Sequence, residues 1–328
     1  MDLNGKRVLL FAPEFFDYYK EIETELSLRG ASVYSILENY ADKDLLYRFF
    51  WIKNEKTRLA YAKKKIESAV AKVPFDPDVV LVIRGEAISK ETASKLRKAY
   101  PNAAFVMYQW DSVRNNPNAT EIAPFFDKVF TFDFVDAKQY GWEYRPLFFI
   151  KKDNEFKEDR KYDLTLIGTL YYKRARLLKN LKEIASLKGY RVLDYLYSDK
   201  TVFYLHKYIM HDKRYADIEK EDVHFTSLSL ERVREVYKDS KVLVDYSADD
   251  QTGLSMRTIE SLGYGCKLVT NNKRIVETDF YNPGNIYIYD IDNFSIPDGF
   301  VETPYAPLEE SMYRYYSLEG WVDTVFGE

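Results

Sequence analysis

The sequence is poor in metal-binding and redox-active side chains. Among its 328 residues there are one cysteine, Cys266, and three histidines. A single cysteine excludes a disulfide framework and a cysteine-rich metal site, and it is consistent with a reducing cytoplasm. His206 and His211 stand five residues apart rather than at the i, i+4 spacing of a helical zinc pair, and His224 lies farther along. We therefore expect no metal site and no cofactor.

Other absences narrow the function further. No apolar run approaches the roughly 20 residues of a membrane-spanning helix, and the first residues lack a signal-peptide pattern. A formal net charge of −4 gives no support to nucleic acid as a partner. The sequence lacks G-x-G-x-x-G, the P-loop pattern and the G-x-S-x-G elbow, which argues against a dinucleotide enzyme, a P-loop NTPase and a serine hydrolase. These features predict a cytoplasmic protein.

Aromatic side chains, by contrast, are abundant. There are 29 tyrosines and 21 phenylalanines, and 46% of the residues are hydrophobic and 30% charged. Tyrosine combines apolar area with a hydroxyl group, which suits contact with sugars, although the same residues can simply fill cores and sheet edges. A chain of this length is sufficient for two globular domains of about 150 residues each.

Strand-like and helix-like patterns alternate along the chain, which predicts parallel α/β sheets. In the first half the expected strands are 7–13, 31–37, 78–85, 103–110 and 128–133, with helices at 14–30, 41–72 and 89–100. In the second half the expected strands are 162–168, 190–197, 241–247, 266–270 and 285–290, with helices at 171–188, 229–239 and 255–262.

A charged stretch without periodicity separates these halves. The pattern predicts an N-terminal domain over 1–150, a linker over 151–161, a C-terminal domain over 162–305 and a helical segment over 306–328. Because ligands of such sheets bind at the carboxyl ends of the strands, the residues that follow each strand are candidate site residues.

The loop after strand 162–168, "IGTLYYKRARLL", has the chemistry of a phosphate grip. Gly168 allows close approach of the backbone, Thr169 precedes a helix N-terminus, and Arg174 supplies positive charge. The alternative is an ordinary strand–turn–helix connection with a solvated basic face.

A second candidate lies in "TGLSMRTIESLGYGCKLVTNN", residues 252–272. Gly253 and Ser255 open a helix whose N–H groups can hold a phosphate, and Arg257 in its first turn adds charge. Glu260, on the same face, can accept hydrogen bonds from a ribose diol. The alternative for Arg257 and Glu260 is a surface ion pair that contributes under ~1 kcal/mol.

This stretch resembles the nucleotide-sugar-binding signature of GT-B glycosyltransferases, most closely the spore-maturation-type and lipopolysaccharide or capsule enzymes. The shared pattern is Gly…Met-Arg-x-x-Glu…Gly…Thr-x-Asn, which ends here at Asn272, with looser likeness in "IGT…R", "QWDS" and "FDKVFTFD". Retaining relatives carry Glu-x7-Glu, whereas Thr252 stands eight residues before Glu260 here.

The resemblance implies two Rossmann-like α/β/α domains that face each other across a cleft, with C-terminal helices that cross back to the N-terminal domain. It implies a nucleotide-diphosphate sugar as donor, bound to the C-terminal domain, a glycan or lipid-linked acceptor on the N-terminal side, and no catalytic metal. The reaction is then sugar transfer in surface polysaccharide or glycoconjugate synthesis. A nucleotide-sugar epimerase and a non-catalytic nucleotide-sugar-binding module remain alternatives.

An inverting transfer needs a base for the acceptor hydroxyl. Asp111, which follows strand 103–110, is the first candidate, and Glu14 after the first strand is the second. Asp111 can instead cap its own loop.

Residues 42–72 hold nine basic and four acidic side chains, with three aromatics at 49–51. This pattern predicts either peripheral contact of residues 45–65 with an anionic membrane or a helix that packs its aromatics inward.

Overall fold

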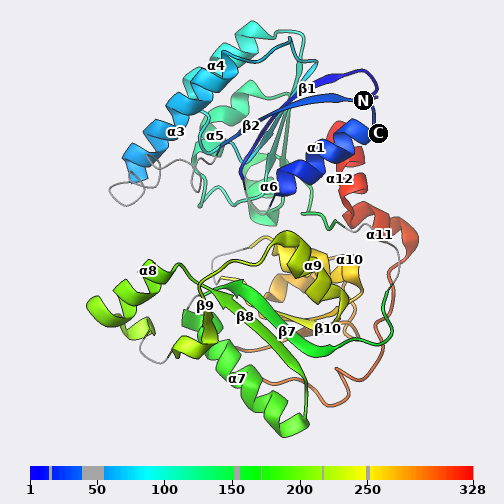
Figure 1. Cartoon of the computed structure of the whole chain (residues 1–328). Helices are drawn as coiled ribbons and strands as arrows, with labels where there is room; N and C mark the ends of the chain where they lie inside the picture. The colour runs from blue at the N-terminus through cyan, green and yellow to red at the C-terminus, as the bar shows by residue number, and fades with distance from the viewer. Residues whose placement is uncertain are drawn as a thin grey trace. The chain divides into compact units, whose positions relative to one another are not determined.

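The computed structural model describes residues 1–14, 17–38, 55–150, 156–170, 172–215, 218–248 and 252–327. The chain forms two compact units (Figure 1). The first unit comprises Met1–Leu147 and Leu318–Glu328, and the second comprises Phe148–Ser317.

The first unit contains a six-stranded parallel sheet of order β2-β1-β3-β4-β5-β6. Its strands are β1 (Arg7–Ala12), β2 (Ser32–Leu37), β3 (Val79–Ile83), β4 (Ala104–Gln109), β5 (Lys128–Thr131) and β6 (Glu143–Tyr144). Its helices are α1 (Tyr18–Leu28), α3 (Glu55–Val70), α4 (Lys90–Ala99), α5 (Asn118–Ile122), α6 (Phe134–Tyr140) and α12 (Leu318–Phe326), with the short 3₁₀ helix η1 (Ala123–Phe125) after α5.

Both faces of this sheet are covered by helices, which explains its continuous apolar strands. Every residue of β3 is buried. Leu9 and Phe11 of β1 join Ala62 and Ile66 of α3 in one apolar core, which α4 and α5 complete. In Figure 1, α1 and α12 cover the other face.

The last helix of the chain belongs to the first unit, as the predicted fold requires. Trp321 of α12 is fully buried, and its ring meets that of Tyr108 edge to face, with centroids 4.9 Å apart. Asp323 of the same helix forms an ion pair with Arg29 at 2.6 Å. The predicted helical segment 306–328 is divided: α11 (Glu310–Tyr316) lies in the second unit, and the division falls at Ser317.

The second unit also contains a six-stranded parallel sheet, of order β12-β11-β10-β7-β8-β9. Its strands are β7 (Tyr162–Thr169), β8 (Val192–Tyr197), β9 (Val223–His224), β10 (Ser240–Asp245), β11 (Lys267–Thr270) and β12 (Ile286–Ile288). Its α-helices are α7 (Tyr172–Lys188), α8 (Lys200–Tyr204), α9 (Leu230–Lys238), α10 (Met256–Tyr264) and α11. A π-helical segment, η2 (Leu205–Ile209), follows α8, and the 3₁₀ helices are η3 (Lys213–Tyr215), η4 (Lys220–Asp222) and η5 (Lys273–Glu277).

The sequence patterns locate the long elements but miss the short ones. Strands β6 and β9 have two residues each, too few to show a period-2 pattern. The helical turns between β8 and β9 were not predicted either, and helix α1 begins at Tyr18 rather than at residue 14.

The predicted linker falls partly on residues 151–155, which lie outside the described residues. Its remainder packs on the second unit: the buried Arg160 guanidinium donates to the carbonyls of Tyr264, at 2.9 Å, and Ser240.

The basic segment 42–72 is described only from residue 55 onward, where α3 places Ala62 and Ile66 in the core. Residues 45–54 of the predicted membrane-contact segment lie outside the described residues. Within the part of the chain that the structure describes, no helix is long and apolar enough to cross a membrane.

Candidate nucleotide-sugar site

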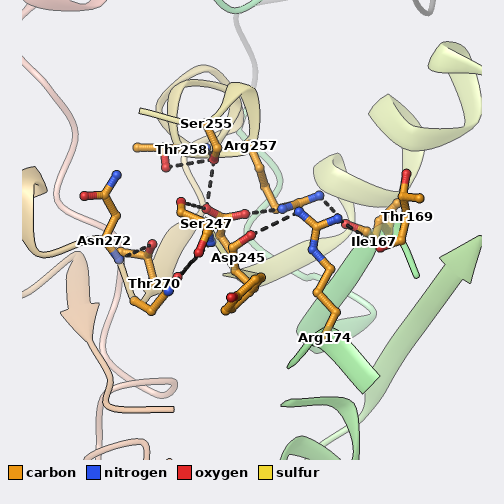
Figure 2. A network of polar contacts seen from close by, with 12 residues as sticks. Ile167, Thr169, Arg174, Asp245, Ser247, Ser255, Arg257, Thr258, Thr270 and Asn272 are labelled. Atoms are coloured by element: carbon orange, nitrogen blue, oxygen red, sulfur yellow. Dashed lines mark hydrogen bonds and ion pairs between the residues drawn. The ribbon is translucent and has the colours of Figure 1, made fainter. Parts of the chain in front are cut away.

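The carboxyl ends of β7 and β10 form one polar site in the second unit. These strands are parallel neighbours, so Thr169 at the end of β7 and Asp245 at the end of β10 lie at the same edge of the sheet. Helix α10 begins beside them at Ser255, whose Oγ accepts from the Thr258 N–H at 3.1 Å and donates to Asp245 Oδ2 at 2.8 Å (Figure 2). The cap of α10 is thus tied directly to the end of β10.

Arg257 and Asp245 form the centre of this site. The Asp245 carboxylate is fully buried and pairs with the Arg257 guanidinium, which also donates to the carbonyl of Ile167 (Figure 2). Burial acts to lower the pKa of Arg257, but the Asp245 carboxylate outweighs it and holds the pKa above its usual range. Arg257 therefore stays charged and has a fixed direction.

A second guanidinium meets the first at Gly168. A Cβ built on Gly168 would lie 3.1 Å from Arg174 Nη1 and 3.2 Å from Arg257 Nη2. Arg174 donates to the carbonyls of Thr169, at 2.9 Å, and Tyr246, at 3.0 Å. Two cationic side chains and one carboxylate therefore lie next to the N-terminus of α10, where the backbone dipole also favours an anion.

The remaining predicted residues of this site lie along the same edge. Asn272 Nδ2 donates to the carbonyl of Gly253 at 3.5 Å, while its Oδ1 accepts from the Arg274 N–H at 3.0 Å. Glu260 lies in α10, and only 7% of it is exposed. Because the Arg257 side chain is also only 12% exposed, the alternative of a surface ion pair between these two residues is wrong.

Sequence reasoning missed three side chains that build this site. Asp245 accepts from Ser247 Oγ at 3.1 Å. Asn271 holds the Ser247 backbone from both sides, since its Oδ1 accepts from the Ser247 N–H at 2.7 Å and its Nδ2 donates to the Ser247 carbonyl at 2.9 Å. The signal for Asp245 was present: it is a carboxylate in an otherwise apolar strand, and such a group needs a charged partner when buried.

The two candidate bases lie on the sheet of the first unit. Asp111 follows β4, and its Oδ2 lies 2.9 Å from Arg84 Nε, with 35% of the Asp111 side chain exposed. Burial raises the pKa of Asp111, Arg84 opposes that shift, and Glu86 adds to it. Glu14 follows β1 and is half-buried; since β3 lies between β1 and β4, the two carboxyls are not on neighbouring strands.

The loop after Asp111 is held by another carboxylate. Asp136 Oδ2 accepts from the Val113 N–H at 2.7 Å, and the Ser112 carbonyl accepts from the N–H groups of Asn115 and Asn116, both at 2.9 Å. Asp111 therefore pairs with Arg84, whereas Asp136 holds the loop that follows Asp111. Among the described residues, no group of three or more His, Cys, Asp or Glu side chains is arranged to hold a metal ion.

No family model and no curated protein matches the sequence, whereas many solved structures match the fold. Anabaena HepE in complex with UDP and glucose is 9% identical, with a TM-score of 0.58 over 99% of this chain and 100% of that one. An alpha-glucosyltransferase in complex with UDP and a mismatched DNA is 13% identical, with a TM-score of 0.54 over 88% and 87%.

A UDP-GlcNAc 2-epimerase from Neisseria meningitidis bound to UDP-GlcNAc is 11% identical, with a TM-score of 0.54 over 98% of this chain and 100% of that one. Identities this low show the fold alone. Together with the two parallel six-stranded sheets, these similarities confirm the predicted fold class: the chain has the two-domain GT-B fold that glycosyltransferases use.

Proposed function

We propose that this protein is a glycosyltransferase that moves a sugar from a nucleotide-diphosphate sugar to a glycan or lipid-linked acceptor. The observation that carries the proposal is the pair of guanidiniums from Arg174 and Arg257, side by side over Gly168 at the N-terminus of α10. The motif resemblance at 253–272 supports a spore-maturation-type or capsule-type enzyme. Because similar structures hold UDP, UDP-sugars are the donors to test first.

In this proposal the diphosphate binds where positive charge and unpaired helix N–H groups meet. Arg174 and Arg257 donate hydrogen bonds to the phosphates, Asp245 keeps Arg257 in place, and the N-terminus of α10 adds partial positive charge. Glu260, one turn further along α10, accepts hydrogen bonds from the ribose hydroxyls. Gly253, Ser255, Asn272, Gly168 and Thr169 are the further residues proposed to contact the nucleotide sugar.

Asp111 is the proposed catalytic base. As the acceptor oxygen bonds to the anomeric carbon, its proton passes to the Asp111 carboxylate. The bond from that carbon to the diphosphate breaks, and its electron pair leaves with the phosphate oxygen. Glu14 is the second candidate for this role. The step as written is that of an inverting transfer.

Metal independence is part of the proposal, because guanidiniums beside a helix N-terminus can stabilise the leaving diphosphate without a cation. Activity retained in excess EDTA is the expected result, and activity that EDTA abolishes and Mg²⁺ restores would overturn it. We further propose a cytoplasmic location with peripheral membrane contact through residues 45–65. Binding to anionic vesicles should then weaken with salt, because exposed charges are screened over ~8–10 Å.

Thermal shift with UDP, UDP-sugars and other nucleotides tests the donor site. A ligand at 100 times its Kd stabilises the folded state by about 2.7 kcal/mol, so a true donor should raise the melting temperature clearly. Arg174→Ala should remove the shift. Arg176→Ala is the matched control, because Arg176 lies on the same helix but pairs with the exposed Asp292. Absence of any nucleotide-dependent shift would contradict the proposal.

An epimerase is the second candidate, favoured by the similarity to the UDP-GlcNAc 2-epimerase structure. Incubation of the donor without acceptor separates the two: an epimerase converts the sugar, whereas a transferase hydrolyses the donor only slowly. A non-catalytic module would bind the nucleotide sugar without turnover of any acceptor.

A further inference from the structure

The turn after β3 in the first unit carries an unusual backbone conformation at Arg84. Its φ is 73°, in the left-handed region, and Gly85 follows with φ 71°. Glycine adopts this region freely, but an L-residue with a Cβ is strained there. An arginine at this position therefore needs an explanation.

Two buried amides hold the strained residue. Gln109 Nε2 and Asn116 Nδ2 both donate to the Arg84 carbonyl at 2.7 Å, and Asn116 Nδ2 also reaches Gln109 Oε1 at 3.2 Å. Gln109 is fully buried and Asn116 is 1% exposed. Asn118 Nδ2 fixes the next residue, Gly85, by donating to its carbonyl at 2.7 Å. The surroundings thus dictate the conformation of Arg84, as is typical of strain at functional sites.

This conformation directs the Arg84 guanidinium onto two carboxylates. Arg84 Nε lies 2.9 Å from Asp111 Oδ2, and Nη2 lies 2.9 Å from Glu86 Oε2. The contact with Asp111 is an ion pair and not an aligned hydrogen bond, since Arg84 Nε has no hydrogen-bond partner among the described residues. The three side chains are 21–35% exposed. Two partly exposed ion pairs add little to stability and, at best, balance the strain of the backbone. A gain in stability is therefore not a sufficient reason for arginine to occupy this turn.

A third carboxyl lies behind this pair. Glu38 is 2% exposed, and its Oε2 accepts from the Glu86 N–H at 3.2 Å, while Oε1 has no hydrogen-bond partner among the described residues. Burial raises the pKa of Glu38 to about 8, against the effect of Arg84 and with that of Glu86. Because Glu38 is neutral below that pH, it does not compete with Asp111 and Glu86 for the positive charge of Arg84.

We propose that Arg84 is a positioning residue for sugar transfer, holding the Asp111 carboxylate in the orientation that receives the proton of the acceptor hydroxyl. Arg84 acts through Asp111 and does not itself contact the reacting atoms. The inference rests on the proposed transferase function. It assigns the left-handed turn and its two buried amides, Gln109 and Asn116, to the support of that carboxylate.

Arg84→Gly is the decisive variant, because glycine relieves the strain while it removes the guanidinium. We expect an unchanged or higher melting temperature and a fall in kcat of about 10² or more, with the donor KM within a few-fold of the unmodified protein. Arg84→Asn, which also tolerates the left-handed region, is the second variant and should behave alike. A kcat within threefold of the unmodified value in a folded variant would overturn the assignment.

The matched control is Arg7→Ala. Arg7 makes a similar ion pair, from Nε to Asp78 Oδ2 at 3.2 Å, at the amino ends of β1 and β3 in the same sheet. Its loss should leave kcat unchanged, because that pair lies at the amino ends of the strands. If kcat fell equally in Arg7→Ala and Arg84→Gly, the loss would reflect general structural damage, and the assignment of Arg84 would be wrong.

A pH profile separates positioning from packing. Burial raises the pKa of Asp111 and Glu86 adds to that shift, whereas Arg84 lowers it. Without Arg84 the acidic limb of kcat/KM should move to higher pH. An NMR titration that follows the carboxyl carbon of Asp111 measures the same pKa change and does not require the enzyme to turn over. An unshifted Asp111 titration overturns the pairing, whereas absence of turnover in the unmodified protein overturns the transferase proposal instead.

Discussion

Arg257 in the first turn of α10 forms an ion pair with Asp245, a fully buried carboxylate at the end of β10. The pair joins a helix to a strand across a loop, and it fixes the direction of a guanidinium that the sequence alone presents as a flexible surface charge. The consequences for stability and for ligand binding can be separated by substitution.

Asp245→Asn should destabilise the protein by about 3–5 kcal/mol, because it leaves the Arg257 cation buried without its counter-charge. Denaturant unfolding of the variant measures the loss. Asp292→Asn, which removes the partner of the exposed Arg176, should change stability by under ~1 kcal/mol. Equal stability of the two variants would show that the buried pair contributes no more than a surface pair.

Gly168→Ala should weaken nucleotide binding without unfolding the protein. The added methyl group would lie 3.1–3.2 Å from the ends of two flexible side chains, Arg174 and Arg257, which can shift but then leave their positions. A tenfold loss of UDP affinity, about 1.4 kcal/mol, is the expected scale by calorimetry. Gly284→Ala, whose Cβ would approach only the Asn282 side chain, is the control. Unchanged affinity in Gly168→Ala would contradict the proposed diphosphate position.

Substitutions of Glu260 and Arg174 should affect the binding of UDP and pyrophosphate differently. If Glu260 accepts from the ribose hydroxyls, Glu260→Gln should weaken UDP binding and leave pyrophosphate binding unchanged. Arg174→Ala should weaken both, because it removes charge from the phosphate position. Calorimetry with the two ligands on each variant gives the four affinities. A parallel loss of UDP and pyrophosphate in Glu260→Gln would point to a structural role for this carboxylate.

Asp111→Asn keeps the shape of the side chain and removes its basicity. The transfer rate should fall by about 10²–10⁴ with donor affinity nearly unchanged. Glu14→Gln is measured in parallel, and a loss confined to that variant would move the base to Glu14. Near-normal rates in both variants would argue for a course in which no carboxylate takes the acceptor proton.

Glu38→Gln should change how stability depends on pH. With a pKa of about 8 in the folded state, against 4.5 as the ordinary value, Glu38 binds a proton in the folded protein that the unfolded chain has already released. Its contribution to stability therefore falls as pH rises through that window, by about 1.4 kcal/mol per pH unit. The variant lacks this loss, so it should match the unmodified protein near pH 4.5 and gain relative stability toward pH 8. A difference that does not vary with pH would contradict the assignment.

The fold was predictable because long apolar strands alternate with amphipathic helices. Strand β3 is apolar throughout and buried, and the glycine-rich end of α10 leads directly into β11. The two-residue strands β6 and β9 were not predictable, because their pairing depends on neighbours that are distant in sequence.

The site residues were predictable where a motif surrounds them, as for Ser255, Arg257 and Glu260. The partners of those residues were not. Asp245 stands in an apolar strand twelve residues before Arg257, and its pairing with Arg257 depends on how α10 packs beside the end of β10. The left-handed backbone conformation of Arg84 could not be predicted, because no residue pattern around Arg84 indicates it.

The return of α12 to the first unit makes the second unit an insertion within the first. The chain leaves the first unit after Leu147 and re-enters it at Leu318, and the Met1 amino group donates to the Phe326 carbonyl at 2.6 Å. A single cut near residue 147 therefore cannot yield two independent halves, because the N-terminal fragment would lack Trp321, which fills its core. Removal of residues 148–317 with a short splice is the rational way to isolate the first unit, whereas the second unit is one continuous segment, Phe148–Ser317, and can be produced as it stands.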